Sequence, residues 1–266
     1  MTSMESGVII AKIGGSTLGS HDTTLGDVAL LHGEGRRVVV VHGGGDLVSR
    51  WLQTHGVQAR FLDGLRVTEA DTLEVVVAVL AGLVNKHLVA QLNALGARAV
   101  GLSGADGALL RARRARPELG FVGEITGVER TLLQALLDGG WLPVIAPVAL
   151  EDEAGTVSGQ LLNVNADTVA GEIARHMGAA ALAFLTDVTG VLDGQGRLME
   201  QLSAGEARAM VAAGTIAGGM MPKIEAALAA AAGGTRTVIL DGRQPHALRA
   251  ALAGPKALGT LIKQEP

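Results

Sequence analysis

The chain has 266 residues, of which 48% are hydrophobic and 18% charged, so its composition is that of a globular protein and not of a disordered one. Its formal net charge of -4 argues against a general nucleic-acid binder, and the absence of cysteine excludes disulfides, a thiolate nucleophile and cysteine-ligated zinc. We find no secretory signal and no apolar run that approaches the ~20 residues needed to cross a bilayer, which predicts a soluble, cytoplasmic protein.

Two glycine turns follow short apolar runs near the N-terminus. Residues 8–13 lead to Gly14-Gly15, and residues 38–41 lead to His42-Gly43-Gly44-Gly45. Glycine leaves backbone N–H groups bare, which favours anion binding, and Lys12 adds a positive charge beside the first turn. Two such turns at the carboxyl edge of one parallel sheet would form a floor for negatively charged ligands. We interpret His42 as a packed or turn residue.

The elements that follow these turns predict a parallel sheet with helices on both faces. Helices are expected at residues 24–35 and 46–55, each after a glycine turn. Thr68 and Asp71 resemble a capping box that starts a long helix through about residue 95. Because this helix is apolar around most of its circumference, it is either wholly inside the protein or shared with another subunit.

Strands and helices continue to alternate in the rest of the chain. A strand at 97–102 precedes a basic run at 111–116, which we interpret as a solvated hairpin edge and not a nucleic-acid contact, because no aromatic residues are interleaved. The remaining predicted elements are a helix at 131–139, a strand at 142–148, a polar loop or hairpin at 151–159, a helix at 168–177, a strand at 180–185, helices at 204–213 and 224–232, and strands at 237–240 and 258–262.

Several familiar signatures of catalysis are missing. The chain lacks the P-loop pattern, the dinucleotide-binding fingerprint, the His-Glu-x-x-His zinc pattern and the Gly-x-Ser-x-Gly turn. What remains is a set of polar groups at strand ends and helix starts: Lys12, Arg66, Asn163, Asn165, Asp167, Asp187 and Lys223.

Each of these groups has a structural alternative to a functional role. The lysines could be surface residues, Arg66 could form an exposed salt bridge, and the Asn-x-Asn-x-Asp stretch at 163–167 could turn the chain and cap a helix. Lys12 and Lys223 each adjoin a Gly-Gly pair and a helix start, and Pro222 suits a first helical turn, so their surroundings favour an anion. A guanidinium fork such as that of Arg66 suits a substrate carboxylate.

Six motifs occur in an order and at intervals that are specific together, although each alone is weak. They are Lys12-Ile13-Gly14-Gly15, His42-Gly43-Gly44-Gly45, Gly64-Leu65-Arg66-Val67-Thr68, Asn163-Val164-Asn165-Ala166-Asp167, Thr186-Asp187-Val188-Thr189-Gly190-Val191 and Gly218-Gly219-Met220-Met221-Pro222-Lys223. The chain thereby resembles the N-acetylglutamate kinase family of the amino-acid kinase superfamily over residues 9–262.

The resemblance implies a fold and an activity. The fold is an α/β three-layer sandwich with an open, mainly parallel central sheet and two lobes, residues 1–177 for the acyl amino acid and dimerisation and residues 178–266 for ATP. The implied activity is ATP-dependent phosphorylation of the side-chain carboxylate of N-acetyl-L-glutamate to N-acetyl-L-glutamyl 5-phosphate, in arginine biosynthesis. The alternatives are a kinase of carrier-bound aminoadipate and a non-catalytic nucleotide-binding sensor, against which the presence of both lysines argues.

The resemblance also implies residue roles. Lys12 and Lys223 stabilise the phosphoryl group, and Asp167 holds both lysines in place. Gly44 and Gly45, with Gly14 and Gly15, are the implied backbone donors to phosphate and substrate, while Arg66, Asn163 and Asn165 are the implied substrate-binding side chains. The residues that fall where the family binds its nucleotide are Asp187, Val188, Thr189, Gly190, Val191, Leu192, Thr215, Ile216 and Ala217. Magnesium is expected to arrive with ATP and not to occupy a fixed protein cage.

Two departures from the family pattern carry expectations of their own. Many relatives have proline after the triple glycine, where this chain has Asp46. Arginine-inhibited members have an extra N-terminal helix that links dimers into hexamers, and only seven residues precede Val8. We therefore expect a homodimer that is insensitive to arginine, with no nucleic-acid or membrane partner.

Overall fold

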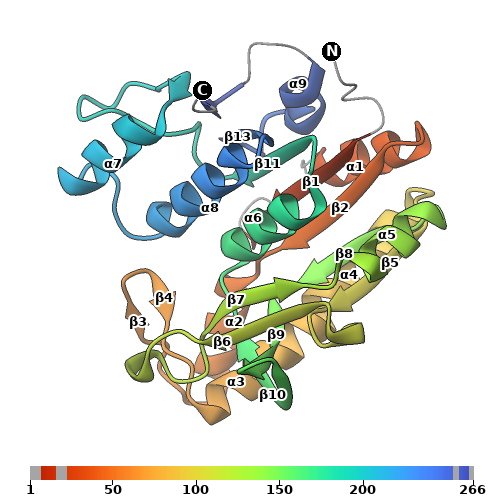
Figure 1. Cartoon of the computed structure of the whole chain (residues 1–266), viewed down its shortest axis with the longest axis vertical. Helices are drawn as coiled ribbons and strands as arrows, with labels where there is room; N and C mark the ends of the chain where they lie inside the picture. Colours follow the sequence, from red (N-terminus) through yellow and green to blue (C-terminus); the bar gives the residue numbers. More distant parts are fainter. Residues whose placement is uncertain (1–6, 16–22, 254–257, 264–266) are drawn as a thin grey trace.

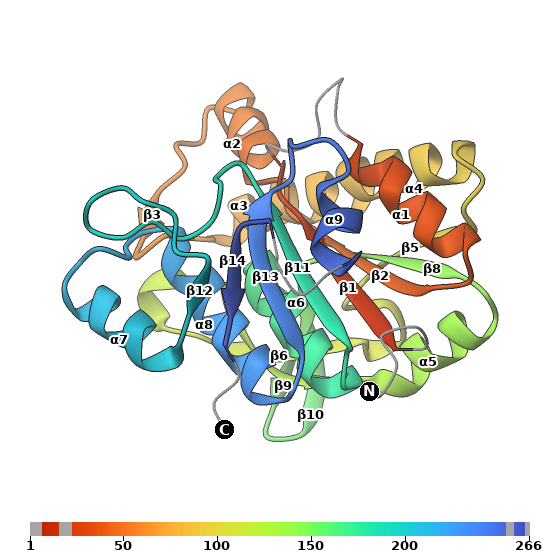
Figure 2. The ribbon, with the colours of Figure 1, turned by 90° about the horizontal axis from the view of Figure 1, so that it is seen from above.

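An eight-stranded sheet forms the middle layer of the protein in a computed structural model, which describes residues 7–15, 23–253 and 258–263. The strand order is β12-β14-β13-β11-β1-β2-β8-β5, and every neighbouring pair is parallel except β13 with β14. The strands are β1 (Val8–Ile13), β2 (Arg37–His42), β5 (Ala99–Ser103), β8 (Leu142–Ala146), β11 (Ala181–Thr186), β12 (Gln201–Leu202), β13 (Arg236–Asp241) and β14 (Thr260–Ile262). The predicted α/β class with a mainly parallel central sheet is confirmed (Figures 1 and 2).

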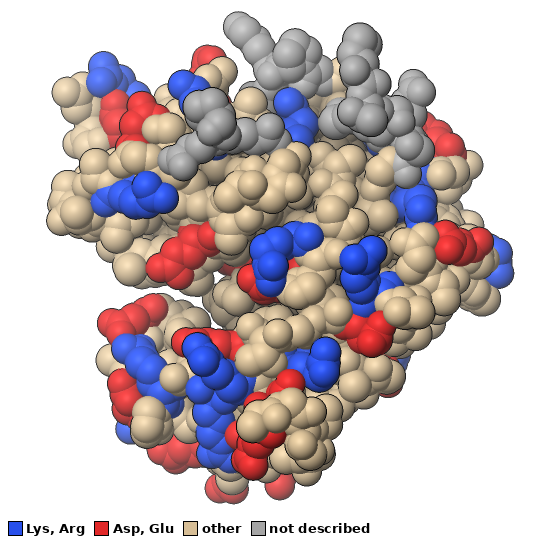
Figure 3. Space-filling view, viewed as in Figure 1, with Lys and Arg blue, Asp and Glu red and all other residues tan. Residues whose placement is uncertain are grey.

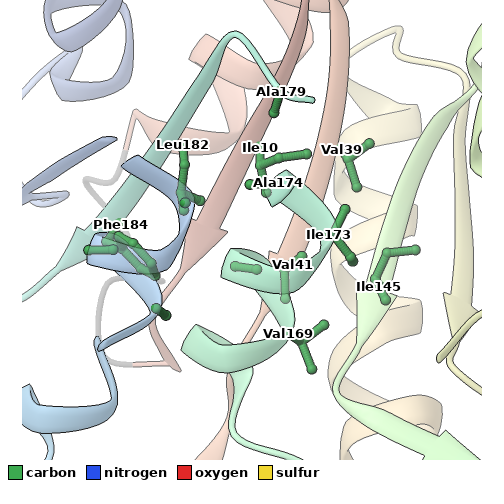
Figure 4. Packing of buried hydrophobic residues seen from close by; sticks show 14 of the residues in the cluster. Ile10, Val39, Val41, Ile145, Val169, Ile173, Ala174, Ala179, Leu182 and Phe184 are labelled. Carbon is green, nitrogen blue, oxygen red and sulfur yellow. The ribbon is translucent and has the colours of Figure 1, made fainter. Parts of the chain in front are cut away.

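Helices cover both faces of this sheet because alternate residues of each strand point to opposite sides. Ile9 belongs to the core under α1 (Thr24–Gly33), α2 (Gly45–Thr54) and α9 (Ala247–Ala253). Its neighbour Ile10 belongs to the core on the other face, as do residues of α5 (Arg130–Asp138), α6 (Ala166–Met177), α7 (Ala204–Ala212) and α8 (Met220–Ala232). Figure 4 shows Val169 and Ile173 of α6 among the side chains of the central strands. Helix α9 was not predicted from the sequence.

The long helix is continuous from Ala70 to Ala94 and has an unusual middle turn. It consists of α3 (Ala70–Val77), a π-helical segment η2 (Ala78–Val84) and α4 (Asn85–Ala94). The predicted capping box is wrong: Glu69 is the N-cap residue, and the hydroxyl of Thr68 donates to the carbonyl oxygen of Arg66. The Thr68 side chain is therefore committed to the preceding strand and not to the helix.

This helix also corrects the expectation that no apolar run is long enough to span a bilayer. Among the described residues, the segment Ala70–Ala94 alone is a helix of that length and composition, with a mean hydropathy of 1.7 over its most apolar window. Leu88 and Leu92 are buried in the core against the sheet. Only 39% of the window is buried within the chain, so much of this apolar helix lies at the surface.

A second sheet of four strands, in the order β10-β9-β6-β7, packs beside the first. Its strands are β6 (Leu110–Arg114), β7 (Gly123–Val128), β9 (Val148–Glu153) and β10 (Thr156–Asn163). The single strand predicted at 142–148 is in fact two: β8 ends at Ala146, and after Pro147 the chain enters β9 in the other sheet. The alternative of a hairpin at 151–159 is confirmed by the antiparallel pair β9–β10.

The basic run lies inside this sheet, which corrects its interpretation as an edge. Strand β6 pairs with β7 on one side and with β9 on the other. Arg113 lies 3.0 Å from Glu124, and Arg114 lies 2.7 Å from Glu151, so carboxylates on both neighbouring strands pair with its arginines. A two-stranded hairpin, β3 (Phe61–Leu62) and β4 (Leu65–Arg66), projects between this sheet and α8 (Figure 1). Short 3-10 turns η3 (Asp106–Ala108) and η4 (Pro117–Leu119) complete the elements.

Candidate active site

Three buried charged side chains meet at the carboxyl edge of the central sheet. Lys12 lies in β1, Asp167 in the first turn of α6 and Lys223 in the first turn of α8, and each is at most 8% exposed. Asp167 Oδ1 lies 2.8 Å from Lys12 Nζ, and Asp167 Oδ2 accepts a hydrogen bond of 2.8 Å from Lys223 Nζ. The structure thus brings together the three residues that the sequence predicted to be catalytic.

The local sequence explains why these side chains converge. Asn165 is the N-cap of α6, and its Oδ1 accepts hydrogen bonds from the backbone N–H groups of Asp167 and Thr168. The cap role that the sequence allowed for this stretch is therefore filled by Asn165, which leaves the Asp167 side chain available for the lysines. Lys223 is additionally held over the ring of Phe184, at 5.4 Å from its centroid.

Burial and mutual charge shape the ionisation of this cluster. Burial would raise the pKa of Asp167, but the two ammonium groups outweigh it, so the pKa of this carboxyl lies below its ordinary value. Burial and the charge of Lys12 lower the pKa of Lys223 from its ordinary value, and Asp167 opposes that shift. Two ammonium groups and one carboxylate leave a net positive charge in a buried place, which favours a bound anion.

The two glycine turns lie side by side next to this cluster. Strands β1 and β2 are neighbouring parallel strands, and a Cβ on Gly15 would lie 3.1 Å from Gly44 Cα. The N–H of Gly43 donates to Ile13 at 2.9 Å, whereas the N–H groups of Gly44 and Gly45 make no hydrogen bond with the residues that the structure describes. Helix α2 begins at Gly45, so its positive end adds to these donors.

A cavity of about 550 Å³ lies over the lysines and the glycine turns. Figure 3 shows the surface hollowed between the part that carries α7 and α8 and the part that carries the β3–β4 hairpin. Twelve of the predicted site residues line the cavity: Lys12, Gly14, Gly15, Gly44, Gly45, Arg66, Asn163, Asn165, Asp167, Asp187, Val188 and Lys223.

Arg66 enters the cavity from the hairpin side with part of its guanidinium unused. Its Nη2 donates to the carbonyl oxygen of Gly45 and to the hydroxyl of Ser49, both at 2.8 Å, and its Cζ lies 4.7 Å from the centroid of Phe61. Its Nη1 is buried and has no hydrogen-bond partner in the described part of the chain. Burial lowers the pKa of Arg66 from its ordinary value, and the nearby carboxylate of Asp46 opposes this. The N–H groups of Nη1 are therefore not committed to any residue that the structure describes.

Asn163 also lines the cavity and is bonded to the segment that follows the hairpin. Its Nδ2 donates to the hydroxyl of Thr68 at 3.0 Å, and its backbone N–H donates to Phe121. Thr68 in turn contacts the carbonyl of Arg66. Arg66 and Asn163 are therefore positioned by one connected set of hydrogen bonds.

Most of the predicted nucleotide-binding residues lie outside this cavity. Asp187 and Val188 line it, but Thr189, Gly190, Val191, Leu192, Thr215, Ile216 and Ala217 do not. The side chains of Val191 and Ile216 are buried in the core, and the backbone N–H of Val191 donates to Thr260 Oγ1 at 2.8 Å. A nucleotide contact by these residues stays a prediction.

The sequence did not indicate the apolar wall of the cavity. Phe61, Val76, Leu80 and Val122 line it although none of them belongs to a charged or glycine-rich motif. The one sequence signal that could have marked Phe61 is that the chain has only three phenylalanines. Val122 directly precedes strand β7 of the second sheet, whose position no local pattern predicts.

Comparisons with known proteins agree on one family. A model of the amino acid kinase family matches residues 7–241. The acetylglutamate kinase of Halorhodospira halophila is 43% identical over 275 residues, covering 97% of this chain and 90% of that protein. The chloroplastic acetylglutamate kinase of Arabidopsis thaliana is 43% identical over 263 residues, covering 96% of this chain and 74% of that protein.

Solved structures with the same fold include two that match nearly the whole chain. The protein smu.665 from Streptococcus mutans UA159 superposes with a TM-score of 0.84 at 27% identity, covering 97% of this chain and 99% of that one. An N-acetylglutamate synthase from Neisseria gonorrhoeae, complexed with coenzyme A and N-acetyl-glutamate, superposes with a TM-score of 0.83 at 28% identity. The match covers 98% of this chain and 60% of the synthase.

Proposed function

Because the chain belongs to the amino acid kinase family and, within it, to the acetylglutamate kinases, we propose that it phosphorylates N-acetyl-L-glutamate with ATP, in arginine biosynthesis. The observation that carries this proposal is the buried Lys12–Asp167–Lys223 cluster, which faces a cavity beside two turns of glycine N–H groups. Such a site suits a reaction in which two anions must approach each other.

The chemistry asks for charge neutralisation and not for a general base. A side-chain carboxylate with a pKa near ~4 is already ionised at neutral pH. One of its oxygens forms a bond to the γ-phosphorus as the bond from that phosphorus to the β–γ bridging oxygen breaks, and ADP leaves with the electron pair. The obstacle is repulsion and the charge that spreads over the transferring oxygens. Lys12 and Lys223 neutralise that charge from two sides, and the N–H groups of Gly44 and Gly45 add uncharged donors.

The substrate and the nucleotide are proposed to enter from opposite sides of the lysines. Arg66 would hold the substrate's other carboxylate through its unpaired Nη1, and Asn163 and Asn165 line the same cavity. Gly14 and Gly15 lie next to the proposed phosphates, and Asp187 and Val188 mark the nucleotide side. ATP use follows from the family; magnesium is proposed to come with its phosphates, where it would neutralise further charge.

The test is turnover with a trap for the product. Purified protein is incubated with ATP, magnesium and either N-acetyl-L-glutamate, glutamate or aspartate, and the acyl phosphate is captured with hydroxylamine. We expect hydroxamate to form with N-acetyl-L-glutamate and only weakly with the other two acids. In a further incubation with carrier-bound aminoadipate, turnover of that substrate and of none of the three acids would favour the alternative kinase. Nucleotide binding without any hydroxamate would identify a sensor.

We also propose that the protein is a cytoplasmic homodimer. Its two lobes are proposed to divide near residue 177. Support for the dimer comes from the helix Ala70–Ala94, whose apolar composition exceeds what the chain itself buries. Large apolar surfaces of this kind mark contacts with a partner, and in a chain that must stay in solution a second copy covers them most simply.

A further inference from the structure

His42 is the last residue of β2, completely buried directly before the triple glycine, and the chemistry above does not use it. Its Nδ1 lies 2.9 Å from the carbonyl oxygen of Gly43. Because a carbonyl oxygen only accepts hydrogen bonds, this ring nitrogen must carry a hydrogen. The ring is thereby bonded to the first peptide of the glycine turn.

Asn85 determines the state of the other ring nitrogen. Its Nδ2 lies 3.1 Å from His42 Nε2 and 2.9 Å from the carbonyl oxygen of Val144, and its Oδ1 accepts from Lys86 Nζ at 3.0 Å. Since the NH₂ end faces a carbonyl and the oxygen end faces an ammonium group, the amide has one sensible orientation. Asn85 therefore donates to Nε2, which must be unprotonated. His42 is held as the neutral tautomer with its hydrogen on Nδ1.

The segment that delivers Asn85 also supports the glycine turn. The π-helical segment η2 ends at Val84, directly before Asn85. A Cβ on Gly44 would lie 2.8 Å from Leu80 Cδ2 and 3.2 Å from Val84 Cγ2, so this wide helical turn packs against the glycine itself. π-Helical turns are rare and occur frequently at functional sites.

Peptide geometry connects His42 to the cavity. In a trans peptide the C=O and the following N–H point in opposite directions. The C=O of Gly43 is held by the buried ring, so the N–H of Gly44 faces the other way, on the side where Gly43, Gly44 and Gly45 line the cavity. Like the N–H of Gly45, that N–H makes no hydrogen bond with the residues that the structure describes.

We propose that His42 and Asn85 are positioning residues: together they hold the Gly43–Gly44 peptide so that the Gly44 N–H points at the transferring phosphoryl group. This inference rests on the proposed kinase function and adds to it two residues that touch neither substrate. A donor that is already oriented costs nothing to reorganise during the reaction, which is why fixing one peptide has a large effect on rate.

Two variants of similar polarity separate positioning from packing. In His42→Asn the amide NH₂ takes the place of Nδ1 and keeps a donor beside the Gly43 carbonyl. In His42→Gln the amide takes the place of Nε2 and leaves that carbonyl without one. We expect His42→Asn to keep kcat within about fivefold of the wild type and His42→Gln to lose about a hundredfold, with KM for N-acetyl-L-glutamate changed less than about threefold in both. Equal kcat values for the two variants would overturn the inference, whereas an inactive wild type would overturn only the proposed function.

If either variant folds poorly, NMR spectroscopy tests directly which ring nitrogen of His42 carries the hydrogen. In the wild-type protein labelled with ¹⁵N-histidine, the His42 signals are identified by their loss in whichever variant folds, or otherwise by correlation to the neighbouring backbone. We expect a protonated Nδ1 and an unprotonated Nε2 between about pH 6 and pH 8, and a ring protonated on both nitrogens in Asn85→Asp, where a carboxylate faces Nε2 while the Gly43 carbonyl still faces Nδ1. A wild-type ring protonated on Nε2 would refute the arrangement.

Discussion

Asp167 controls the charge balance of the site at the scale of single residues. In Asp167→Asn the two lysines lose their shared carboxylate and face each other in a buried place. Removing one partner of a buried ion pair typically costs about 3–5 kcal/mol, so we expect a decrease of this size in the free energy of unfolding, measured by urea denaturation. The control combines Lys12→Met, Asp167→Asn and Lys223→Met, which removes the whole cluster and should recover much of the loss. A single variant as stable as the wild type would contradict the burial of this triad.

The three cations of the cavity are predicted to have different kinetic roles. Lys12→Ala and Lys223→Ala should lower kcat far more than they weaken binding, because these lysines meet charge that develops in the transition state. Arg66→Ala should mainly raise KM for N-acetyl-L-glutamate, because its unpaired Nη1 is proposed to hold a carboxylate throughout the reaction. Steady-state kinetics of the three variants measure this, and equal effects on kcat from all three would contradict the assignment.

The stability of the protein should depend on pH through His42. Burial, together with the charges of Lys12 and Lys86, lowers the pKa of this histidine to about 4, although its hydrogen bond to Gly43 opposes the shift. An unfolded chain takes up this proton near pH ~6.5, so the folded state loses stability as the pH falls from there toward 4. Between about pH 7 and pH 5 the loss amounts to about 2 kcal/mol. Urea denaturation should show this loss in the wild type and not in His42→Asn. If the free energy of unfolding depends on pH in the same way in both proteins, His42 is not its cause.

The sequence allowed us to predict site residues that are charged or that neighbour a glycine turn. It did not allow us to predict site residues without such a marker. Lys12 and Lys223 each adjoin a glycine pair in the sequence, and both line the cavity. Thr68 matched a capping pattern, but its hydroxyl bonds to Arg66 and receives Asn163, a contact across 95 residues of sequence. A local sequence pattern cannot predict a contact between residues so far apart in the chain.

At the scale of elements, the turn after β2 requires glycine at one position and tolerates a side chain at the next. Gly44 has a φ of 150°, and an added Cβ would approach Leu80 to 2.8 Å. We expect Gly44→Ala to lower the free energy of unfolding by about 2–5 kcal/mol, from backbone strain and overpacking together. Gly45→Ala is the matched control, since its nearest neighbour would be Arg66 Nη2 at 3.8 Å and it lies in a helix. Thermal unfolding compares the two, and equal losses would show that the turn has no special geometry.

Helices and strands could be predicted where the local sequence pattern agreed with the structure that the segment adopts. The apolar runs of β1, β2 and β11 identified the central strands, and the glycine turns placed their helices. The boundary at Pro147 was not predicted, because a buried strand of another sheet looks in the sequence like a continuation of the preceding strand. Helix α9 consists largely of alanine and leucine, and the π-helical segment has no sequence signature that distinguishes it from an α-helix.

At the scale of the whole molecule, one sheet runs through both proposed lobes. Strand β11, which follows residue 177, pairs with β1, so the lysines from the two parts share one framework. The sequence order of strands and helices predicted this class of fold, but not the second sheet that forms one side of the cavity. The proposed lobe boundary near residue 177 therefore does not divide the central sheet.

The surface of the long helix makes the dimer testable without disturbing the fold. Gly82 lies in the π-helical segment, is exposed, and has open space where a Cβ would point. In Gly82→Glu each monomer accommodates the new side chain, but a two-fold interface over this helix brings two carboxylates into one apolar contact. We expect this variant to be a folded monomer by sedimentation velocity at concentrations where the wild type is a dimer.

The control for this experiment places the same charge on a different helix. Gly205 is exposed in the first turn of α7 and also has open space around its missing Cβ. Gly205→Glu changes the net charge by the same amount, so it should leave the dimer intact if the interface lies on the long helix. Monomers in both variants would mean that net charge alone separates the subunits. A dimer in both would place the interface elsewhere, and the apolar surface of Ala70–Ala94 would then need another partner.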